Sequence, residues 1–266
     1  MCYLCLGGDL DNDGQPLRRD CACRGSDAGF VHLSCLAEYA ATKSKGWDGR
    51  DMDEFVEPWR ECPSCHQEYQ NKLGIDIASE FVSFVRRQYP SDTEKQVVSL
   101  FVKLRALNSM FGRLQSVQKR ETGVTANVML SLIDRMKKEV SPLPLRYSQM
   151  EASAYYTHGQ IALNEGTEES ARRAVVHFEQ SLQVFEAIGD AVRIAHAKAN
   201  ITTAKSKYEG GNNNEELVKA SRELYELRIA ELGEENEYTI RTGRQYAIDL
   251  HEVNRLEEAR DLLMFC

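Results

Sequence analysis

The sequence lacks any long hydrophobic run. Lys, Arg, Asp or Glu interrupts the apolar residues every few positions, so no stretch approaches the roughly 18 to 20 residues that a membrane-spanning helix needs. The N-terminus also lacks the basic segment and the apolar core of a secretory signal. We therefore expect a soluble protein with no membrane segment and a cytoplasmic location, with the nucleus as the alternative.

An excess of basic residues is missing as well. The chain holds 33 Lys and Arg against 41 Asp and Glu, which gives a formal net charge of -8. A general nucleic-acid-binding protein needs a basic face to neutralise phosphates, so no nucleic-acid partner is expected. Glycine-rich phosphate loops, a nucleophile elbow and paired histidines on one helix are absent, and no hydrolase or nucleotide-binding function is predicted.

Cysteine is concentrated at one end of the chain. Seven of the eight cysteines fall within the first 65 residues, and the eighth is Cys266. In a chain without a secretory signal, clustered cysteines indicate metal binding more than disulfides. Residues 1 to about 70 also show little hydrophobic periodicity, as expected of a small domain that metal, and not a large core, holds together.

Four pairs of Cys and His residues have the spacing of zinc ligands. Two residues separate the members of three pairs, and one residue separates the members of the fourth. Eight such ligands satisfy two tetrahedral zinc ions. Free buried thiols or disulfide partners are the alternative. The predicted ligands are, in chain order, Cys2, Cys5, Cys21, Cys23, His32, Cys35, Cys62 and Cys65.

This order of ligands resembles the RING-CH zinc finger, whose members include the membrane-associated MARCH ubiquitin ligases. The resemblance covers residues 2 to about 70 and implies a cross-braced pair of zinc ions. Cys2, Cys5, His32 and Cys35 would hold one ion, and Cys21, Cys23, Cys62 and Cys65 the other. The segments that carry the resemblance are Cys21-Ala22-Cys23-Arg24-Gly25-Ser26, Phe30-Val31-His32-Leu33-Ser34-Cys35-Leu36 and Cys62-Pro63-Ser64-Cys65.

The same resemblance implies a groove for a ubiquitin-conjugating enzyme. RING-type ligases hold a charged conjugating enzyme so that a substrate lysine attacks the thioester more readily, which is catalysis by positioning. The matching contact positions here are Leu4, Tyr39 and Pro63; packing of the small zinc core is their alternative role. Tyr39 stands where relatives usually have Trp, and His66 stands where many active members have Arg.

The PHD finger, a chromatin reader, shares this ligand order and is a less favoured alternative. Trp59 lies three residues before Cys62, as PHD fingers often have it. However, one residue between Cys21 and Cys23 and eight residues between Cys23 and His32 agree better with RING-CH spacing.

Beyond residue 70 the sequence predicts almost continuous helix. Asp76 is expected to cap a first helix, which ends where a proline follows. Ser91 and Glu94 form the pattern of a capping box for a second helix. A third helix is expected over 126–140, and the proline-containing segment 141–145 is expected to be extended and to mark a boundary.

From about Tyr147 the pattern changes to paired helices with glycine-containing turns. Gly189 and Gly233 end similar helices 44 residues apart, a weak repeat with the period of helix-pair solenoids. About 110 residues here resemble tetratricopeptide (TPR) repeats of the kinesin-light-chain type; an irregular helical bundle is the alternative. The predicted helices cover 149–165, 170–188, 191–208, 215–232, 238–252 and 256–264, with a further turn at Gly210–Asn212.

The predicted fold class is thus a small zinc-stabilised α+β RING-CH finger followed by an all-α, TPR-like repeat region. The expected domains are the finger at 1–70, a helical linker or scaffold at 71–146 and the repeats at 147–266. The predicted function is that of a ubiquitin ligase, which binds a conjugating enzyme through the finger and a protein substrate or adaptor through the repeats. A non-catalytic adaptor, in which both parts only bind proteins, is the alternative.

Overall fold

The computed structural model describes residues 1–19, 21, 23, 29–47, 49, 51–208 and 214–265. The predicted turn at Gly210–Asn212, the motif residues Ala22 and 24–26, and Cys266 lie outside the described residues. The chain forms two compact units, Met1–Ser141 and Pro142–Cys266. The finer division at residues 70 and 146 stays a prediction.

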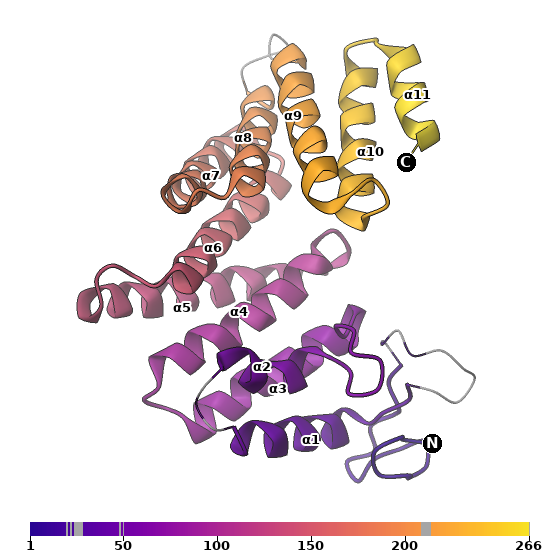
Figure 1. Ribbon diagram of the computed structural model, residues 1–266, viewed down its shortest axis with the longest axis vertical. Helices are drawn as coiled ribbons and strands as arrows, with labels where there is room; N and C mark the ends of the chain where they lie inside the picture. Colours follow the sequence, from indigo (N-terminus) through magenta and orange to yellow (C-terminus); the bar gives the residue numbers. More distant parts are fainter. Residues whose placement is uncertain are drawn as a thin grey trace. The chain divides into compact units, whose positions relative to one another are not determined.

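In the part of the chain that the structure describes, the first unit holds the cysteine-rich segment and five α-helices (Figure 1). Within the described residues, its β-structure consists of three isolated antiparallel bridges, which join Leu10 to Pro16, Arg18 to Val31 and Glu61 to Glu68. The helices are α1 (Leu33–Lys45), α2 (Met52–Arg60), α3 (Asn71–Gln88), α4 (Thr93–Ser109) and α5 (Ser116–Glu139), with a 3-10 turn at Phe111–Arg113.

Helix α3 begins earlier than predicted, so the expected cap at Asp76 is wrong. The helix starts at Asn71, and its first turns place Leu73 and Ile75 in the core. Burial of these two side chains favours the longer helix more than a capping carboxylate at residue 76 would. Asp76 instead lies 3.7 Å from the guanidinium of Arg18, which connects the helix to the cysteine-rich segment.

The next two helix starts also differ from the prediction. The N-cap of α4 is Asp92, whose carboxylate accepts a hydrogen bond from the Lys95 amide at 2.9 Å, and not Ser91. Carboxylate and hydroxyl side chains cap helices about equally well. The sequence alone therefore could not show whether Asp92 or Ser91 is the N-cap. Helix α5 begins at Ser116, ten residues before the predicted 126.

An aromatic cluster joins the cysteine-rich segment to α3. Trp59 is 1% exposed, stacks on Phe81 at 5.1 Å between ring centroids and donates its indole N–H to the Ser44 hydroxyl at 2.7 Å. Phe55 lies 5.6 Å from Phe81 and is fully buried. The tryptophan that suggested a PHD finger is therefore a core residue, which packs α2 against α3.

The second unit is a stack of helix pairs. Each helix packs mainly on the next one in the chain, as in TPR-like repeats, and this confirms the predicted helical-repeat region. All six predicted helices of this region are present, with ends within four residues of the expected ones. They are α6 (Leu145–Asn164), α7 (Glu168–Ile188), α8 (Ala191–Ser206), α9 (Asn214–Leu232), α10 (Glu237–Glu252) and α11 (Leu256–Phe265).

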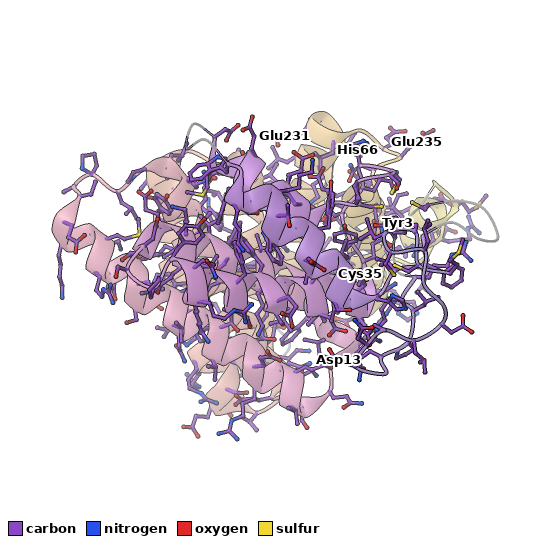
Figure 2. All side chains as sticks on the ribbon, turned by 90° about the horizontal axis from the view of Figure 1, so that it is seen from below. Tyr3, Asp13, Cys35, His66, Glu231 and Glu235 are labelled. Atoms are coloured by element: carbon purple, nitrogen blue, oxygen red, sulfur yellow. The ribbon has the colours of Figure 1, made fainter. Side chains whose placement is uncertain are left out.

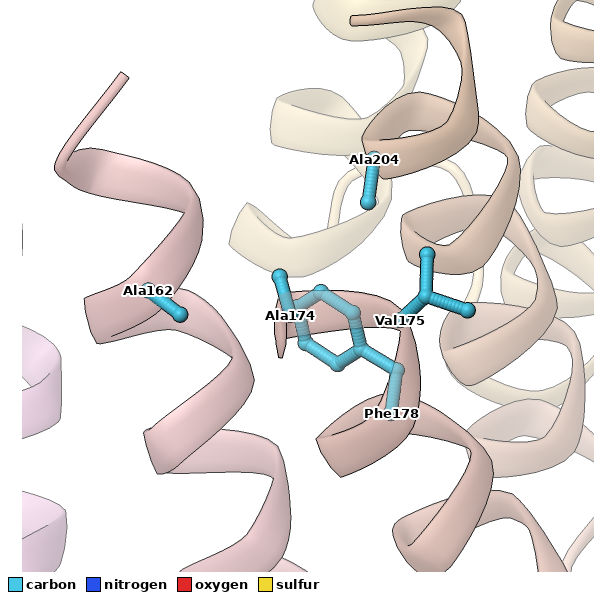
Figure 3. Packing of buried hydrophobic residues seen from close by; sticks show 5 residues of the cluster. All are labelled: Ala162, Ala174, Val175, Phe178 and Ala204. Carbon is cyan, nitrogen blue, oxygen red and sulfur yellow. The ribbon is translucent and has the colours of Figure 1, made fainter. Parts of the chain in front are cut away.

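Phe178 of α7 forms the centre of the first helix pair's core. Its ring is fully buried and packs among small residues of α6, α7 and α8 (Figure 3). Small side chains around one large ring allow the helix backbones to approach closely. The cluster consists of Ala162, Ala174, Val175, Phe178 and Ala204. Within the described residues of the whole chain, no helix has the length and apolar character that crossing a membrane requires.

A polar network connects α6 to α8. The Tyr156 hydroxyl lies 3.1 Å from Nε2 of His196 and accepts a hydrogen bond from the Gln160 amide at 2.8 Å. The same amide donates to Asn200 Oδ1 at 2.8 Å. Because Gln160 already donates to the tyrosine oxygen, the tyrosine proton is free to be donated to a neutral imidazole.

The network makes the second unit sensitive to acid. Burial, and then the positive charges of Arg228 and Arg241, lower the pKa of His196 from 6.5 to about 3. The neutral imidazole therefore contributes stability above pH 6.5, and this contribution falls as the pH decreases from 6.5 towards 3. Since part of the side chain still reaches water, we expect a loss of about 1–2 kcal/mol between pH 7 and pH 5.

Denaturant unfolding at both pH values tests this expectation. His196→Gln keeps an acceptor for Tyr156 and should remove most of the difference between pH 7 and pH 5. His251→Gln, at an exposed position on α10, is the matched control and should keep it. Equal acid sensitivity in both variants would show that His196 is not the responsible group.

Candidate metal centres

The first group of predicted ligands comes together in space. The ligand atoms of Cys2, Cys5, His32 and Cys35 all lie within 4.8 Å of one another. Nδ1 of His32 is 3.5 Å from the sulfur of Cys5 and 3.6 Å from that of Cys35. Tetrahedral zinc, with bonds of about 2.3 Å to sulfur and 2.0–2.1 Å to nitrogen, separates such atoms by about 3.6 Å. The donor set therefore fits zinc.

His32 is held in the orientation that a metal ligand needs. The residue is 1% exposed, and its Nε2 lies 3.1 Å from the carbonyl oxygen of Gly8. A proton on Nε2 donated to this carbonyl leaves Nδ1 unprotonated and directed at the three sulfurs. The antiparallel bridge between Arg18 and Val31, with hydrogen bonds of 2.8 and 3.0 Å, fixes the backbone next to the histidine.

The second group is formed by Cys21, Cys23, Cys62 and Cys65, again within 4.8 Å. The sulfurs of Cys23 and Cys62 are 3.6 Å apart, close to the separation of about 3.8 Å at a tetrahedral Zn–S₄ centre. Gly29 was not predicted as part of this site. It has a φ of 79°, and a Cβ on it would lie 2.9 Å from the Cys21 sulfur, so this position requires glycine.

The first and last cysteine pairs are presented by equivalent loops. In one loop the amide of Leu6 donates to the Cys2 carbonyl at 2.9 Å, and in the other the amide of His66 donates to the Cys62 carbonyl at 2.9 Å. Leu6 and His66 both adopt positive φ values, 57° and 56°. Such tight turns direct backbone N–H groups towards the sulfurs, as in the Gly7 amide 3.4 Å from the Cys5 sulfur.

These loops favour thiolates at one cysteine of each group. Burial opposes ionisation of Cys2, but the backbone amides of Cys5, His32 and Leu4 outweigh it and lower the pKa to about 7. The pKa of Cys62 is lowered in the same way, against its burial, by backbone N–H groups. Burial and the neighbouring sulfurs raise the pKa of Cys35 to about 12. A full set of thiolates therefore requires a cation to neutralise it.

Two tyrosines lie beside the second ligand group. The hydroxyls of Tyr3 and Tyr69 are buried, and the described residues offer neither of them a hydrogen-bond partner. Burial, together with the nearby Cys62, raises the pKa of both. Zinc-bound thiolates would be acceptors for such hydroxyls. Figure 2 shows Tyr3 and Cys35 in the cysteine-rich segment, among its sulfur atoms. No spacing rule indicated these tyrosines.

Of the three predicted contact residues, the structure brings two into one cavity. Tyr39 on α1 and Pro63 in the last cysteine pair line a cavity of about 400 Å³, together with Cys62 and His66. Leu4 is half-buried, as are Tyr39 and Pro63, but it does not line this cavity. His66 is exposed. The cavity thus contacts the second ligand group directly.

Comparison with known proteins identifies the first part of the chain. Residues 2–49 match the RING-variant domain; Cys62 and Cys65 follow this range and complete the second ligand group. No curated protein matches. Two crystal structures of Podosopora anserina putative kinesin light chain TPR-like repeats, one of them a single-residue variant, are each 14% identical. Their TM-scores are 0.42 and 0.43.

The first of these structures covers 88% of this chain and 92% of its own, and the variant covers 87% and 91%. At such TM-scores the likeness supports no conclusion about the second unit, whose helix pairs are described above on their own contacts. The N-terminal match and the two ligand groups agree with each other. The cysteine-rich segment is therefore a RING-variant zinc finger, whose ligands fit two structural zinc ions.

Proposed function

We propose that this chain is a RING-type ubiquitin ligase. The finger recruits a ubiquitin-conjugating enzyme through Leu4, Tyr39 and Pro63, and the helical unit binds a protein substrate or adaptor. The observation that carries the proposal is the cavity lined by both Tyr39 and Pro63 beside the second ligand group. The RING-variant match over residues 2–49 supports the same class of function.

The bound zinc ions would supply structure and no chemistry. One ion would tie the Cys2–Cys5 loop to His32 and Cys35 at the start of α1, the helix that carries Tyr39. The other would tie the Cys62–Cys65 loop, which holds Pro63, to Cys21 and Cys23. A rigid contact surface is what catalysis by positioning requires, because the conjugating enzyme carries the reactive thioester. The expected cytoplasmic or nuclear location belongs to this proposal.

The helical unit would supply the protein-binding surface. Stacked helix pairs form extended faces suited to a polypeptide partner, and its polar network places Gln160, Asn200 and His196 on neighbouring helices.

Autoubiquitination of the full chain with a panel of conjugating enzymes tests the ligase proposal. We expect Pro63→Ala to reduce ubiquitin transfer at least about tenfold, and Leu4→Ala to reduce it less, because a truncated apolar contact at the centre of an interface costs more than one at its rim. Zinc content should stay at two ions per chain in both variants. The matched control is Pro16→Ala, an exposed proline of the same finger outside the cavity.

The adaptor alternative is favoured by one observation. His66 is exposed and lines the cavity where many active RING domains have arginine, and an imidazole lacks the bidentate hydrogen-bonding geometry of a guanidinium group. Two bound zinc ions without ubiquitin transfer by any panel member would support the adaptor. If such a finger still binds a conjugating enzyme, His66→Arg should produce measurable ubiquitin transfer.

A further inference from the structure

A lysine of α4 lies inside an aromatic cage. The Lys95 ammonium is 4.8 Å from the ring centroid of Tyr89, 5.1 Å from that of Trp47 and 5.8 Å from that of Phe55. Asp92 is its carboxylate partner, and the lysine side chain is only 13% exposed. A cation within about 6 Å of a ring is attracted by the ring quadrupole, more strongly where water is excluded.

The cage joins two parts of the first unit. Lys95 and Tyr89 belong to the scaffold around α3 and α4, whereas Trp47 lies in the connection from α1 to α2 and Phe55 lies on α2. Phe55 is fully buried, and its backbone carbonyl accepts a hydrogen bond from the Ser44 hydroxyl at 3.0 Å. Trp47 is half-buried; its ring lies 5.3 Å from Phe55, and its indole N–H donates to the Asp51 carbonyl at 2.6 Å.

Trp47 also belongs to the wall of the proposed docking cavity. It lines that cavity together with Tyr39 and Pro63. The ring that the Lys95 ammonium attracts is therefore part of the surface assigned to the conjugating enzyme.

We propose that Lys95 is a positioning residue for this cavity: its positive charge holds Trp47 in the cavity wall. The expected effect on binding of a conjugating enzyme rests on the proposed function. The expected effect of the Lys95 charge on the position of Trp47 does not depend on that function. Loss of the charge would release Trp47 without touching a zinc ligand. The charge state of one scaffold residue would thus set the shape of a surface on the finger.

Substitutions at Lys95 separate charge from packing. Lys95→Met keeps an unbranched aliphatic chain of similar length and removes the charge. Lys95→Arg keeps the charge and can stack on aromatic rings. Lys103→Met is the matched control, because Lys103 lies on the same helix, is 14% exposed and pairs with Glu121; among the described residues no aromatic ring lies over it.

Acrylamide quenching of tryptophan fluorescence reads out the position of Trp47. The chain has two tryptophans, and Trp59 is 1% exposed, so the quenchable emission comes mainly from Trp47. We expect Lys95→Met to raise the quenching constant about twofold and to weaken binding of a conjugating enzyme about five- to tenfold, as loss of a partly desolvated cation–π contact implies. Lys95→Arg and Lys103→Met should match the wild type, and all should hold two zinc ions.

Quenching of Lys95→Met equal to that of the wild type would overturn the hold on Trp47. Increased quenching with unchanged affinity would overturn the positioning role. If the wild type binds no conjugating enzyme, the proposed function fails, but quenching still decides whether Lys95 holds Trp47. Should Lys95→Met fail to fold, Tyr89→Leu removes one ring of the cage from the scaffold side and should raise quenching in the same way.

Discussion

Replacing His32 by Ala is expected to reduce the zinc content from two ions per chain to one. His32 supplies the only nitrogen of the first ligand group, and three sulfurs do not complete a tetrahedral structural site. Structural zinc contributes about 10–16 kcal/mol of apparent binding free energy in small zinc fingers. Loss of one ligand should therefore unfold the loops of the first pair, which elemental analysis and limited proteolysis would detect.

The control for this substitution is His66→Ala. His66 directly follows Cys65 but is exposed and outside both ligand groups, so two zinc ions should remain bound. The helical signal in circular dichroism should change little in either variant, because α3, α4 and α5 each bury apolar side chains of their own, among them Ile77, Leu104 and Ile133. Two zinc ions in His32→Ala would mean that another group binds the first metal.

Replacing Phe178 by Ala is expected to lower the free energy of unfolding of the helical unit by about 3–5 kcal/mol. The ring is fully buried, and Tyr156 packs against it at 5.5 Å between centroids. Removing a buried phenyl ring loses its transfer free energy and leaves a cavity that helices fill only in part. Urea unfolding followed by circular dichroism would measure the loss.

Gly159 provides a second test of the packing around Phe178. A Cβ at Gly159 would lie 2.5 Å from the nearest ring atom of Phe178, so Gly159→Ala should cost about 1–3 kcal/mol through overpacking, despite the better helix propensity of alanine. In the Phe178→Ala background the ring is gone, and the same change should be neutral or stabilising. Gly112→Ala, where an added Cβ meets nothing within 4 Å, should show no such coupling. Additive effects of the two core changes would contradict the close approach of α6 and α7.

The helical region shows which features a local pattern can predict. Helices of the second unit were predicted within four residues of their ends, because glycine turns such as Gly189, with a φ of 73°, interrupt clear apolar periodicity. The starts of α3 and α5 were not predicted correctly. In α3, burial of Leu73 and Ile75 extends the helix before the capping residue that the sequence suggested. Helix α2 was not predicted from periodicity, and its buried face is formed by its packing against both α1 and α3.

The sequence by itself determined the eight zinc-ligand candidates, because ligand chemistry depends on residue type and short spacings, which are local properties. Their division into two groups was implied by the resemblance to the RING-CH finger, and the structure brings the same two groups together. The sequence also determined that the rest of the chain is helical. Only the tertiary structure decided that Tyr39 and Pro63 share a cavity while Leu4 lies outside it. It also decided which residues adjoin the second ligand group, namely Gly29, Tyr3 and Tyr69. The contact between Lys95 and Trp47 is likewise a feature of the tertiary structure. These contacts join residues far apart in the chain, and their free energy comes from burial and charge, which the folded arrangement alone creates.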